Sequence, residues 1–375
     1  MISIKEKITK NIINALGWRT KHKYVLIESD DWGAVRMPSR SVYEILKNNN
    51  IEVDKFSFDR NDSLESEEDL KQLFNTLRKF KDCNGNNPVV TAYAVLANPN
   101  FEKIEASGRS EYFYETILET YKRSKHTENV PLLWKEGIRE RIFIPQFHGR
   151  EHIHVKRYME AINSNSKKEM IAFKNRAIVS SKSSDCKYGY PKDYFKGFAY
   201  SDSSEFAELE EIHRDGLNIF KEIFGFSSIS FVAQGGVWGD HLLQMMSDQS
   251  VKLVGGQQQI PEKEGGYRVV NKFWGSKNKF KQIHWRRNCR FEPARDKNFD
   301  WINYCLAEME IAFRWGKPAV ISSHRENFTG SIFEENRVEN LKKLEMLLAE
   351  MLKRWPDIEF ISTAQLAEKM MLKTK

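Results

Sequence analysis

Short apolar runs rich in β-forming residues alternate with longer helical patterns along almost the whole chain. The apolar runs cover residues 23–28, 88–96, 141–147, 228–233, 251–254, 282–285, 318–322 and 357–361. Amphipathic helical patterns lie between several of them, at 66–80, 205–223, 300–315 and 335–353. Strands that alternate with helices are typical of parallel βα units. We therefore predict an α/β protein with a distorted (β/α)7–8, TIM-like barrel, formed by residues 1–375 as a single domain.

The composition supports a folded chain and narrows the class of protein. The 375 residues are 40% hydrophobic and 12% aromatic, which is enough to build a buried core. The net charge of +7 arises from 59 basic and 52 acidic residues, a mild bias that argues against a dedicated nucleic-acid binder. The four cysteines, at 83, 186, 289 and 305, form no CxxC pair. This spacing argues against a zinc knuckle or a disulfide framework and predicts a reducing, cytoplasmic location.

The first 22 residues form an amphipathic pattern. Ile4, Ile8 and Ile12 recur at helical spacing, with lysines between them. We predict an N-terminal amphipathic helix that packs on the protein's own body; the alternative is a helix that rests on a membrane surface. The chain has no run near the roughly 18 to 20 apolar residues that span a bilayer, so any membrane contact is expected to be peripheral.

Polar residues that directly follow apolar runs are the candidates for chemistry, because barrel active sites lie where strands end. The first run ends in "ESDD", residues 28–31. Asp30 and Asp31 either cap the following turn or form a metal ligand beside a general base. Glu28 stays without a role: it is either a partner of a site residue or a buried, hydrogen-bonded strand residue.

Histidines and glycines follow three later runs. His148 and His152 stand four residues apart, so that both rings can reach one cation, whereas His154 is expected to pack rather than to bind metal. His324 follows the run "PAVIS" and is either structural or a general acid. Gly235 and Gly236 form either a tight turn or a backbone N–H site for a developing oxyanion.

These motifs, in this order, resemble the polysaccharide deacetylase superfamily, and in particular its divergent branch from bacterial surface-polysaccharide gene clusters. The resemblance spans residues 24–324 and implies a distorted (β/α) barrel. It implies that Asp31, His148 and His152 bind a divalent metal ion, with Zn²⁺ the expected ion. It further implies that Asp30 is the base that activates water and that His324 is the acid that protonates the leaving amine.

The sequence departs from the family pattern at two places. Trp32 stands between the aspartate pair and Gly33, where the family has glycine directly, so Trp32 is predicted to contact substrate. The family's third motif carries an arginine and a Pro-Tyr pair that "VAQGGVWGD" lacks. Two segments are candidates for the aspartate-tryptophan motif that tunes the acid histidine: Asp300-Trp301 and "RRNCRFEP" (286–293).

A basic segment, residues 276–290, bears on the substrate. It contains six lysines and arginines, no acid, and several aromatic or imidazole rings. It is either a solvated hairpin or a rim that stacks sugars and binds anions, in which Arg286 and Arg287 contact the substrate. The second reading predicts an acetylated sugar that is nucleotide- or lipid-linked.

The preferred function is a metal-dependent carbohydrate deacetylase, a hydrolase of a carbon–nitrogen, non-peptide bond, that acts in surface-polysaccharide biosynthesis. Two rivals remain. Glu28 and Asp30 could serve as the acid–base pair of a metal-independent glycoside hydrolase, which would not need the paired histidines. A non-catalytic carbohydrate-binding relative would retain the fold and bind sugar without releasing acetate.

Overall fold

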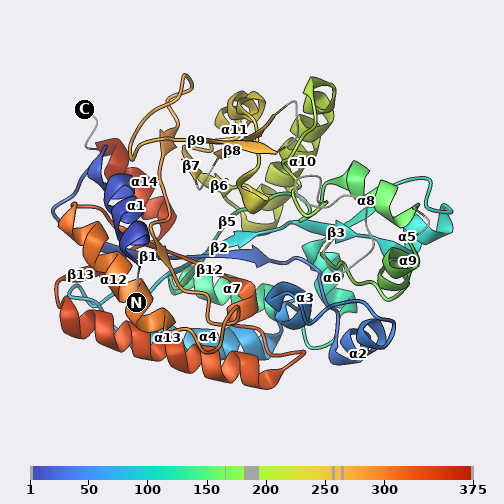
Figure 1. The fold of residues 1–375 in the computed structure, drawn as a ribbon, viewed down its shortest axis with the longest axis horizontal. Coiled ribbons are helices and arrows are strands. Elements are labelled where there is room, and N and C mark those ends of the chain that lie inside the picture. The colour runs from blue at the N-terminus through green and yellow to red at the C-terminus, as the bar shows by residue number, and fades with distance from the viewer. Residues whose placement is uncertain (1–2, 165, 181–193, 256–257, 263–265, 373–375) are drawn as a thin grey trace.

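A curled parallel β-sheet forms the centre of the molecule (Figure 1). The computed structural model describes residues 3–164, 166–180, 194–255, 258–262 and 266–372. The strands follow the order β10-β7-β6-β5-β2-β1-β12-β11, and β13 pairs with β1 beside this path. Their bounds are β1 Lys23–Trp32, β2 Val90–Ala94, β5 Phe143–Phe147, β6 Ser230–Val232, β7 Leu253–Gly255, β10 Ile283–His284, β11 Cys289–Arg290, β12 Ala319–His324 and β13 Ile358–Phe360.

The predicted alternation of strands and helices is confirmed. Each of the eight predicted apolar runs overlaps one of these strands, and neighbouring strands pair in parallel. Strands β10 and β11 are the two edge strands of this sheet. The predicted distorted (β/α) barrel is therefore confirmed as a curled sheet that stays open on one side. The two-residue strand β11 was not predicted, because its segment is polar.

Helices cover the outside of the sheet. The longer ones are α1 Ile4–Ala15, α4 Glu67–Arg78, α7 Val130–Arg139, α10 Phe206–Phe224, α12 Trp301–Arg314, α13 Glu334–Arg354 and α14 Thr363–Leu372. The four predicted helical patterns coincide, within one or two residues at each end, with α4, α10, α12 and α13. Helices α12, α13, α4 and α7 follow one another around the sheet, as Figure 1 shows.

Shorter elements extend the carboxyl ends of the strands, on the right in Figure 1. They are the helices α2 Arg40–Asn48, α3 Ser57–Asn61, α5 Phe101–Ala106, α6 Ile117–Arg123, α8 Val155–Ile162 and α9 Lys167–Lys174, with the antiparallel pair β3 Ala97–Pro99 and β4 Tyr114–Thr116. Elsewhere lie α11 Leu243–Asp248, the antiparallel pair β8 Gln258–Pro261 and β9 Tyr267–Val270, and the 3-10 turns η1 Ser203–Glu205, η2 Gln234–Gly236, η3 Asp240–Leu242 and η4 Arg325–Asn327.

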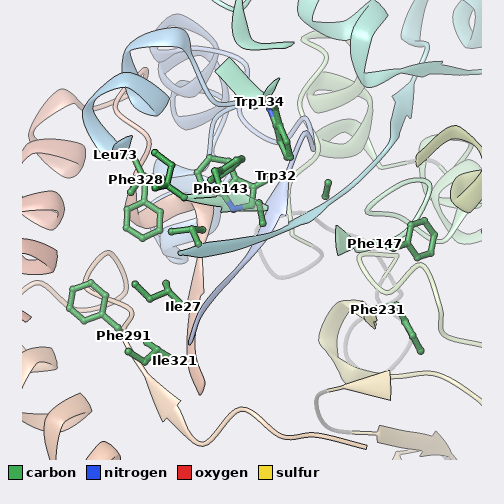
Figure 2. Packing of buried hydrophobic residues seen from close by; sticks show 14 of the residues in the cluster. Ile27, Trp32, Leu73, Trp134, Phe143, Phe147, Phe231, Phe291, Ile321 and Phe328 are labelled. Carbon is green, nitrogen blue, oxygen red and sulfur yellow. The ribbon is translucent and has the colours of Figure 1, made fainter. Parts of the chain in front are cut away.

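The largest apolar cluster fills the space between the sheet and the helices on one side. Figure 2 shows Trp32 beside Phe143 and Phe328. The Trp32 ring meets Phe143 edge-on with ring centroids 4.8 Å apart, and it lies nearly parallel to Phe328 at 6.3 Å. Aromatic side chains bury large apolar areas, so this cluster fixes the end of β1 against the rest of the core.

Helix α1 contacts the body with its polar side. The Lys10 ammonium lies 2.6 Å from the Glu308 carboxylate of α12, and the amide of Asn14 is fully buried. Ile4, Ile8 and Ile12 are instead 80%, 57% and 67% exposed. The predicted N-terminal helix therefore does pack on the protein's own body, but through its polar side, because its hydrogen bonds and its ion pair orient it. Among the described helices, none combines the length and the apolar character that crossing a membrane requires.

Candidate active site

The carboxyl ends of β1, β5 and β12 bring the predicted polar residues together. Asp30 of β1 is the register partner of His324 of β12, and His148 directly follows β5. One ligand atom from each of Asp31, His148 and His152 lies within 4.8 Å of the others. These five residues come from three distant parts of the sequence and share one site, because parallel strands end at the same edge of the barrel.

Asp31 reaches this site because β1 is irregular at its end. The register between β1 and β2 shifts between Ser29 and Trp32, and the backbone of Asp31 has a φ of 74°. A regular strand would direct Asp30 and Asp31 to opposite faces of the sheet. The left-handed conformation, which aspartate adopts more readily than most residues, breaks that alternation. Both carboxylates consequently lie buried at the mouth of the barrel.

The two histidines direct their Nε2 atoms to the same carboxylate oxygen. His152 Nε2 lies 2.8 Å from Asp31 Oδ1, and His148 Nε2 lies 3.2 Å from it. His148 Nδ1 lies 2.7 Å from the carbonyl oxygen of Val232, to which it donates a hydrogen bond. This bond fixes the tautomer of His148 and leaves its Nε2 available as a ligand atom.

The segment between the two histidines is a bend rather than a helix. The Gln234 side-chain amide donates to the carbonyl oxygens of His148 at 2.6 Å and Glu151 at 2.8 Å. The Gln234 side-chain oxygen accepts from the Gly197 amide at 2.8 Å, so that one buried side chain holds three backbone groups. Helix α8 begins only after His154, which is its N-cap and packs as predicted.

The donor set of this cluster fits a divalent cation. Burial opposes ionisation of Asp31, but its contacts with His152 and His148 outweigh this effect and hold the pKa of Asp31 well below its usual range. Burial lowers the pKa of His152 and so favours its neutral, ligating form. A carboxylate and two imidazole nitrogens, with a further position left for water or substrate, are typical of catalytic Zn²⁺ sites.

Asp30 is held by a buried arginine. Arg287 Nη1 and Nη2 donate to the two Asp30 oxygens, each at 2.6 Å, and Arg287 Nε donates to Glu28 at 2.7 Å. Burial raises the pKa of Asp30, but the charge of Arg287 outweighs it and the pKa is lowered. Glu28 also accepts from Trp285 and Thr363, so it is a buried strand residue that orients Arg287.

His324 has the opposite charge state. Its Nδ1 lies 2.6 Å from Glu292 Oε1, and its Nε2 lies 3.8 Å from Asp30 Oδ2. Burial favours the neutral ring, but Glu292 outweighs this effect and the pKa of His324 rises to about 9. Glu292 belongs to "RRNCRFEP", which is thus the segment that contacts the histidine. Asp300, from the other candidate segment, is the N-cap of α12.

A pocket of about 300 Å³ surrounds these groups. Beyond the predicted residues it is lined by Arg36, Phe56, Phe58, Ser180, Phe195, Lys196 and Arg295, none of which was predicted from the sequence. The Arg36 guanidinium stacks 4.1 Å from the Phe195 ring and 5.2 Å from the Phe58 ring. The sequence at 56–60, FSFDR, carries two of the rings that line the pocket, but its pattern does not differ from that of ordinary core packing.

Trp32 does not contact the pocket, so the prediction that it binds substrate is wrong. Its side chain is 0% exposed and lies in the apolar cluster described above, and its indole N–H donates to Ser29 Oγ at 3.0 Å. Because of the irregular backbone at Asp31, the two carboxylates face the pocket and the side chain of Trp32 faces the apolar cluster. Trp32 therefore acts on the site only through core packing, by fixing the end of β1.

Three other residues that were predicted to bind substrate do not line the pocket: Arg286, Arg287 and Gly236. Arg287 lies within the barrel on Asp30 and Glu28, so it does not belong to an exposed anion-binding rim. Arg286 lies outside the pocket and donates to the carbonyl oxygen of Lys272 at 3.4 Å. The N–H of Gly236 donates to the carbonyl oxygen of Ala233 at 3.0 Å and is not available to a substrate. Gly235 does line the pocket.

Comparisons with known proteins return structures alone: neither a family model nor a curated protein matches the chain. A Mycobacterium smegmatis protein described as a polysaccharide deacetylase is 12% identical, with 96% of this chain and 94% of that chain covered and a TM-score of 0.45. The peptidoglycan deacetylase PdaC from Bacillus subtilis is 9% identical, with 94% and 93% covered and a TM-score of 0.40. A 4-alpha-glucanotransferase from Thermococcus litoralis is also 9% identical, with 94% and 40% covered and a TM-score of 0.45.

At these identities and TM-scores, the matches assign neither an activity nor a ligand to this chain. The architecture itself rests on the strand order and the parallel pairings described above. In fold, the chain is similar to solved structures that include polysaccharide deacetylases, the family that its motifs resemble.

Proposed function

We propose that this pocket removes an acetyl group from the nitrogen of an acetylated sugar by hydrolysis. The observation that carries the proposal is the meeting of three groups of residues in one pocket. They are the ligand cluster Asp31, His148 and His152, the ionised Asp30, and the protonated His324. A ligand cluster beside one base and one acid of opposite charge is the set of parts that metal-assisted amide hydrolysis needs.

The acid–base steps follow from the two charge states. A divalent cation held by the ligand cluster, with Zn²⁺ as the proposed ion, supplies Lewis-acid polarisation of the acyl carbonyl and acidification of water. Asp30 accepts a proton as water oxygen bonds to the carbonyl carbon. His324 donates its Nε2 proton to the amide nitrogen as the carbon–nitrogen bond breaks, which leaves acetate and a free amine. Each proton transfer contributes about 10²–10⁴ in rate.

The lining of the pocket supports a sugar that bears an anionic group. Phe58 and Phe195 offer flat apolar surfaces, and Phe58 lies edge-on to the His324 ring with centroids 5.1 Å apart. Lys196 and Arg295 add positive charge to the lining. We assign the proposed anion contact to these residues in place of Arg286 and Arg287, with Gly235 as the backbone donor for the acyl oxygen. A nucleotide- or lipid-linked sugar of surface-polysaccharide biosynthesis, processed in the cytoplasm, has this chemistry.

The decisive experiment separates the ligands from the base. Metal content by elemental analysis and acetate release are measured together on wild type, His148→Ala and Asp30→Asn. We expect His148→Ala to lose both metal and activity, and Asp30→Asn to keep its metal and lose activity by at least about 10². His22→Ala is the matched control, because its side chain is 56% exposed and it precedes the start of β1, whereas Asp30 and Asp31 lie at the other end of that strand. Full metal content in His148→Ala would contradict the ligand assignment.

Binding of metal and sugar without acetate release in wild type would favour a non-catalytic relative.

The glycoside-hydrolase alternative is disfavoured by a specific observation. The Glu28 carboxylate is 0% exposed and accepts hydrogen bonds from Trp285, Thr363 and Arg287, so it cannot act on a substrate in the pocket.

A further inference from the structure

Helix α1 exposes a continuous apolar stripe. The stripe consists of Ile4, Ile8, Ile12 and Leu16, which are 80%, 57%, 67% and 53% exposed. Residues spaced by four lie one above the other on a helix, so the three isoleucines form one ridge along the outer face, and Leu16 follows as the C-cap of the helix. Close to the carboxyl end of this stripe, the Trp18 amide donates to the Trp274 carbonyl oxygen at 2.8 Å, and the preceding Phe273 is 52% exposed.

The side of α1 that faces the body is polar. The Lys10 ammonium donates to the Asn288 carbonyl oxygen at 2.9 Å and pairs with the buried Glu308, and Asn14 accepts from the Asn288 side chain at 2.9 Å. The Trp315 indole N–H donates to Asn11 at 2.8 Å. Hydrogen bonds and an ion pair thus orient the helix so that its apolar side faces outwards. This is the reverse of the usual arrangement of a surface helix.

Exposed charges around the stripe are basic. Lys5, Lys7, Arg19 and Lys21 are exposed, and the single acid between residues 3 and 21 is Glu6. Its carboxylate accepts from Ser3 and from the Tyr304 hydroxyl at 3.2 Å, and it lies 3.6 Å from Arg290. The acid is therefore turned to the body, while the lysines flank the apolar side chains.

We propose that α1 is a membrane-docking helix that lies on the surface of an anionic lipid bilayer. The stripe enters the boundary between headgroups and acyl chains, and the flanking lysines meet the anionic headgroups. Interfacial helices of this kind combine an apolar face with basic residues at its edges, and their affinity grows with apolar area and with anionic lipid. This docking is independent of the proposed function, since no residue of the stripe lines the active-site pocket.

A bilayer fits the stripe better than a second copy of the chain. A helix of the length of α1, 12 residues, is about 18 Å long and about 10 Å wide, so its outer face offers roughly 180 Å². A stable protein–protein interface needs about 800 Å² from each partner. The basic edges of two copies would also repel one another, whereas they complement anionic lipid.

The test is flotation of the full-length protein with phosphatidylcholine vesicles, with and without phosphatidylglycerol. We expect wild type to float with the anionic vesicles and to dissociate in high salt. The double variant Ile8→Gln/Ile12→Gln is expected to bind at least about tenfold more weakly. Lys5→Gln/Lys7→Gln is expected to lose its preference for phosphatidylglycerol. Leu132→Gln is the matched control, because Leu132 is a 60% exposed aliphatic residue on another helix, α7.

Circular dichroism and thermal unfolding check that each variant keeps its fold, as expected for exposed positions. Sedimentation equilibrium of the same proteins tests the rival occupant. Absence of wild-type binding to anionic vesicles would overturn the proposal. So would an equal loss of binding in Leu132→Gln, or a wild-type dimer that Ile8→Gln/Ile12→Gln dissociates, which would show that a second copy covers the stripe.

Discussion

Single neighbours set opposite charge states on the two acid–base residues of the pocket. Arg287 holds Asp30 ionised, and Glu292 holds His324 protonated, although Asp30 is buried and His324 is half-buried. Burial alone would drive each group to its neutral form. The pocket therefore depends on one arginine and one glutamate that do not themselves line it.

The first prediction concerns the alkaline limit of activity. His324 must be protonated to donate, so acetate release should fall as the pH rises through the pKa of His324. Glu292→Gln removes the charge that raises this pKa, and the alkaline limb of kcat should then move to lower pH by about one unit or more. Glu310→Gln, at an exposed ion pair with Arg314, should leave the profile in place. An unchanged limb in Glu292→Gln would contradict the assignment of His324 as the acid.

A second prediction concerns the acidic limit. Arg287→Met leaves burial unopposed at Asp30, so the pKa of Asp30 should rise and the acidic limb of kcat/KM should move to higher pH. We expect kcat/KM at neutral pH to fall by at least about 10². The neighbouring Arg286→Met is the control and should change kcat/KM by less than about twofold, because Arg286 lies outside the pocket. Equal losses of kcat/KM in Arg287→Met and Arg286→Met would instead support the anion-binding rim that the sequence predicted.

At the scale of elements, the apolar runs of the sequence predicted where the strands lie. The polar residues that directly follow those runs predicted where the candidate site lies. The prediction for Trp32, which came from its place beside the aspartate pair, was wrong because the left-handed backbone at Asp31 is a local exception that no hydrophobic pattern records. The sequence did not predict that Arg287 contacts Asp30 or that Glu292 contacts His324, because these two residues flank β11, a polar strand of two residues. The amphipathic pattern of α1 predicted a helix, but a pattern cannot tell which face the rest of the chain will bind.

The bend between His148 and His152 gives a prediction at this scale. Gln234→Leu removes the side chain that holds the carbonyl oxygens of His148 and Glu151, and it leaves these buried groups without that partner. We expect metal affinity, measured by competition with a chelator, to fall by about 10–100-fold. Gln72→Leu on α4, where the side chain bonds only to Glu68, should keep wild-type affinity. Unchanged affinity in Gln234→Leu would show that the bend holds its shape without this residue.

At the scale of the whole molecule, a buried ion network joins the ends of β1 and β12. Arg325, which is 0% exposed, donates to Asp62 and to Glu65, each at 2.9 Å. Glu65 in turn accepts from the backbone N–H of Gly33, directly after β1, at 3.1 Å. The segment that contains Asp62 and Glu65 therefore connects the two strand ends that carry Asp30 and His324.

Replacement of Arg325, whose guanidinium joins the two carboxylates of this network, tests how far the fold depends on the network. Arg325→Met removes the cation shared by two buried carboxylates and leaves Asp62 with Arg36 as its counter-charge, at 3.7 Å, so we expect the free energy of unfolding in urea to fall by about 3–5 kcal/mol. Arg314→Met breaks an exposed ion pair with Glu310, where the arginine side chain is 60% exposed, and should cost less than about 1 kcal/mol. Equal losses in the two variants would show that the network adds no more than a surface pair.

The pH dependence of this loss identifies its cause. Burial raises the pKa of Asp62 to about 6 even with Arg325 present, so folded wild type binds more protons than the unfolded chain and loses stability as the pH rises towards 6. Without Arg325 the pKa of Asp62 rises further, because the favourable charge is gone. The unfolding free energy of Arg325→Met should therefore keep falling between pH 6 and pH 8, where this group no longer affects wild type. A deficit that stays constant over that range would attribute the loss to packing rather than to buried charge.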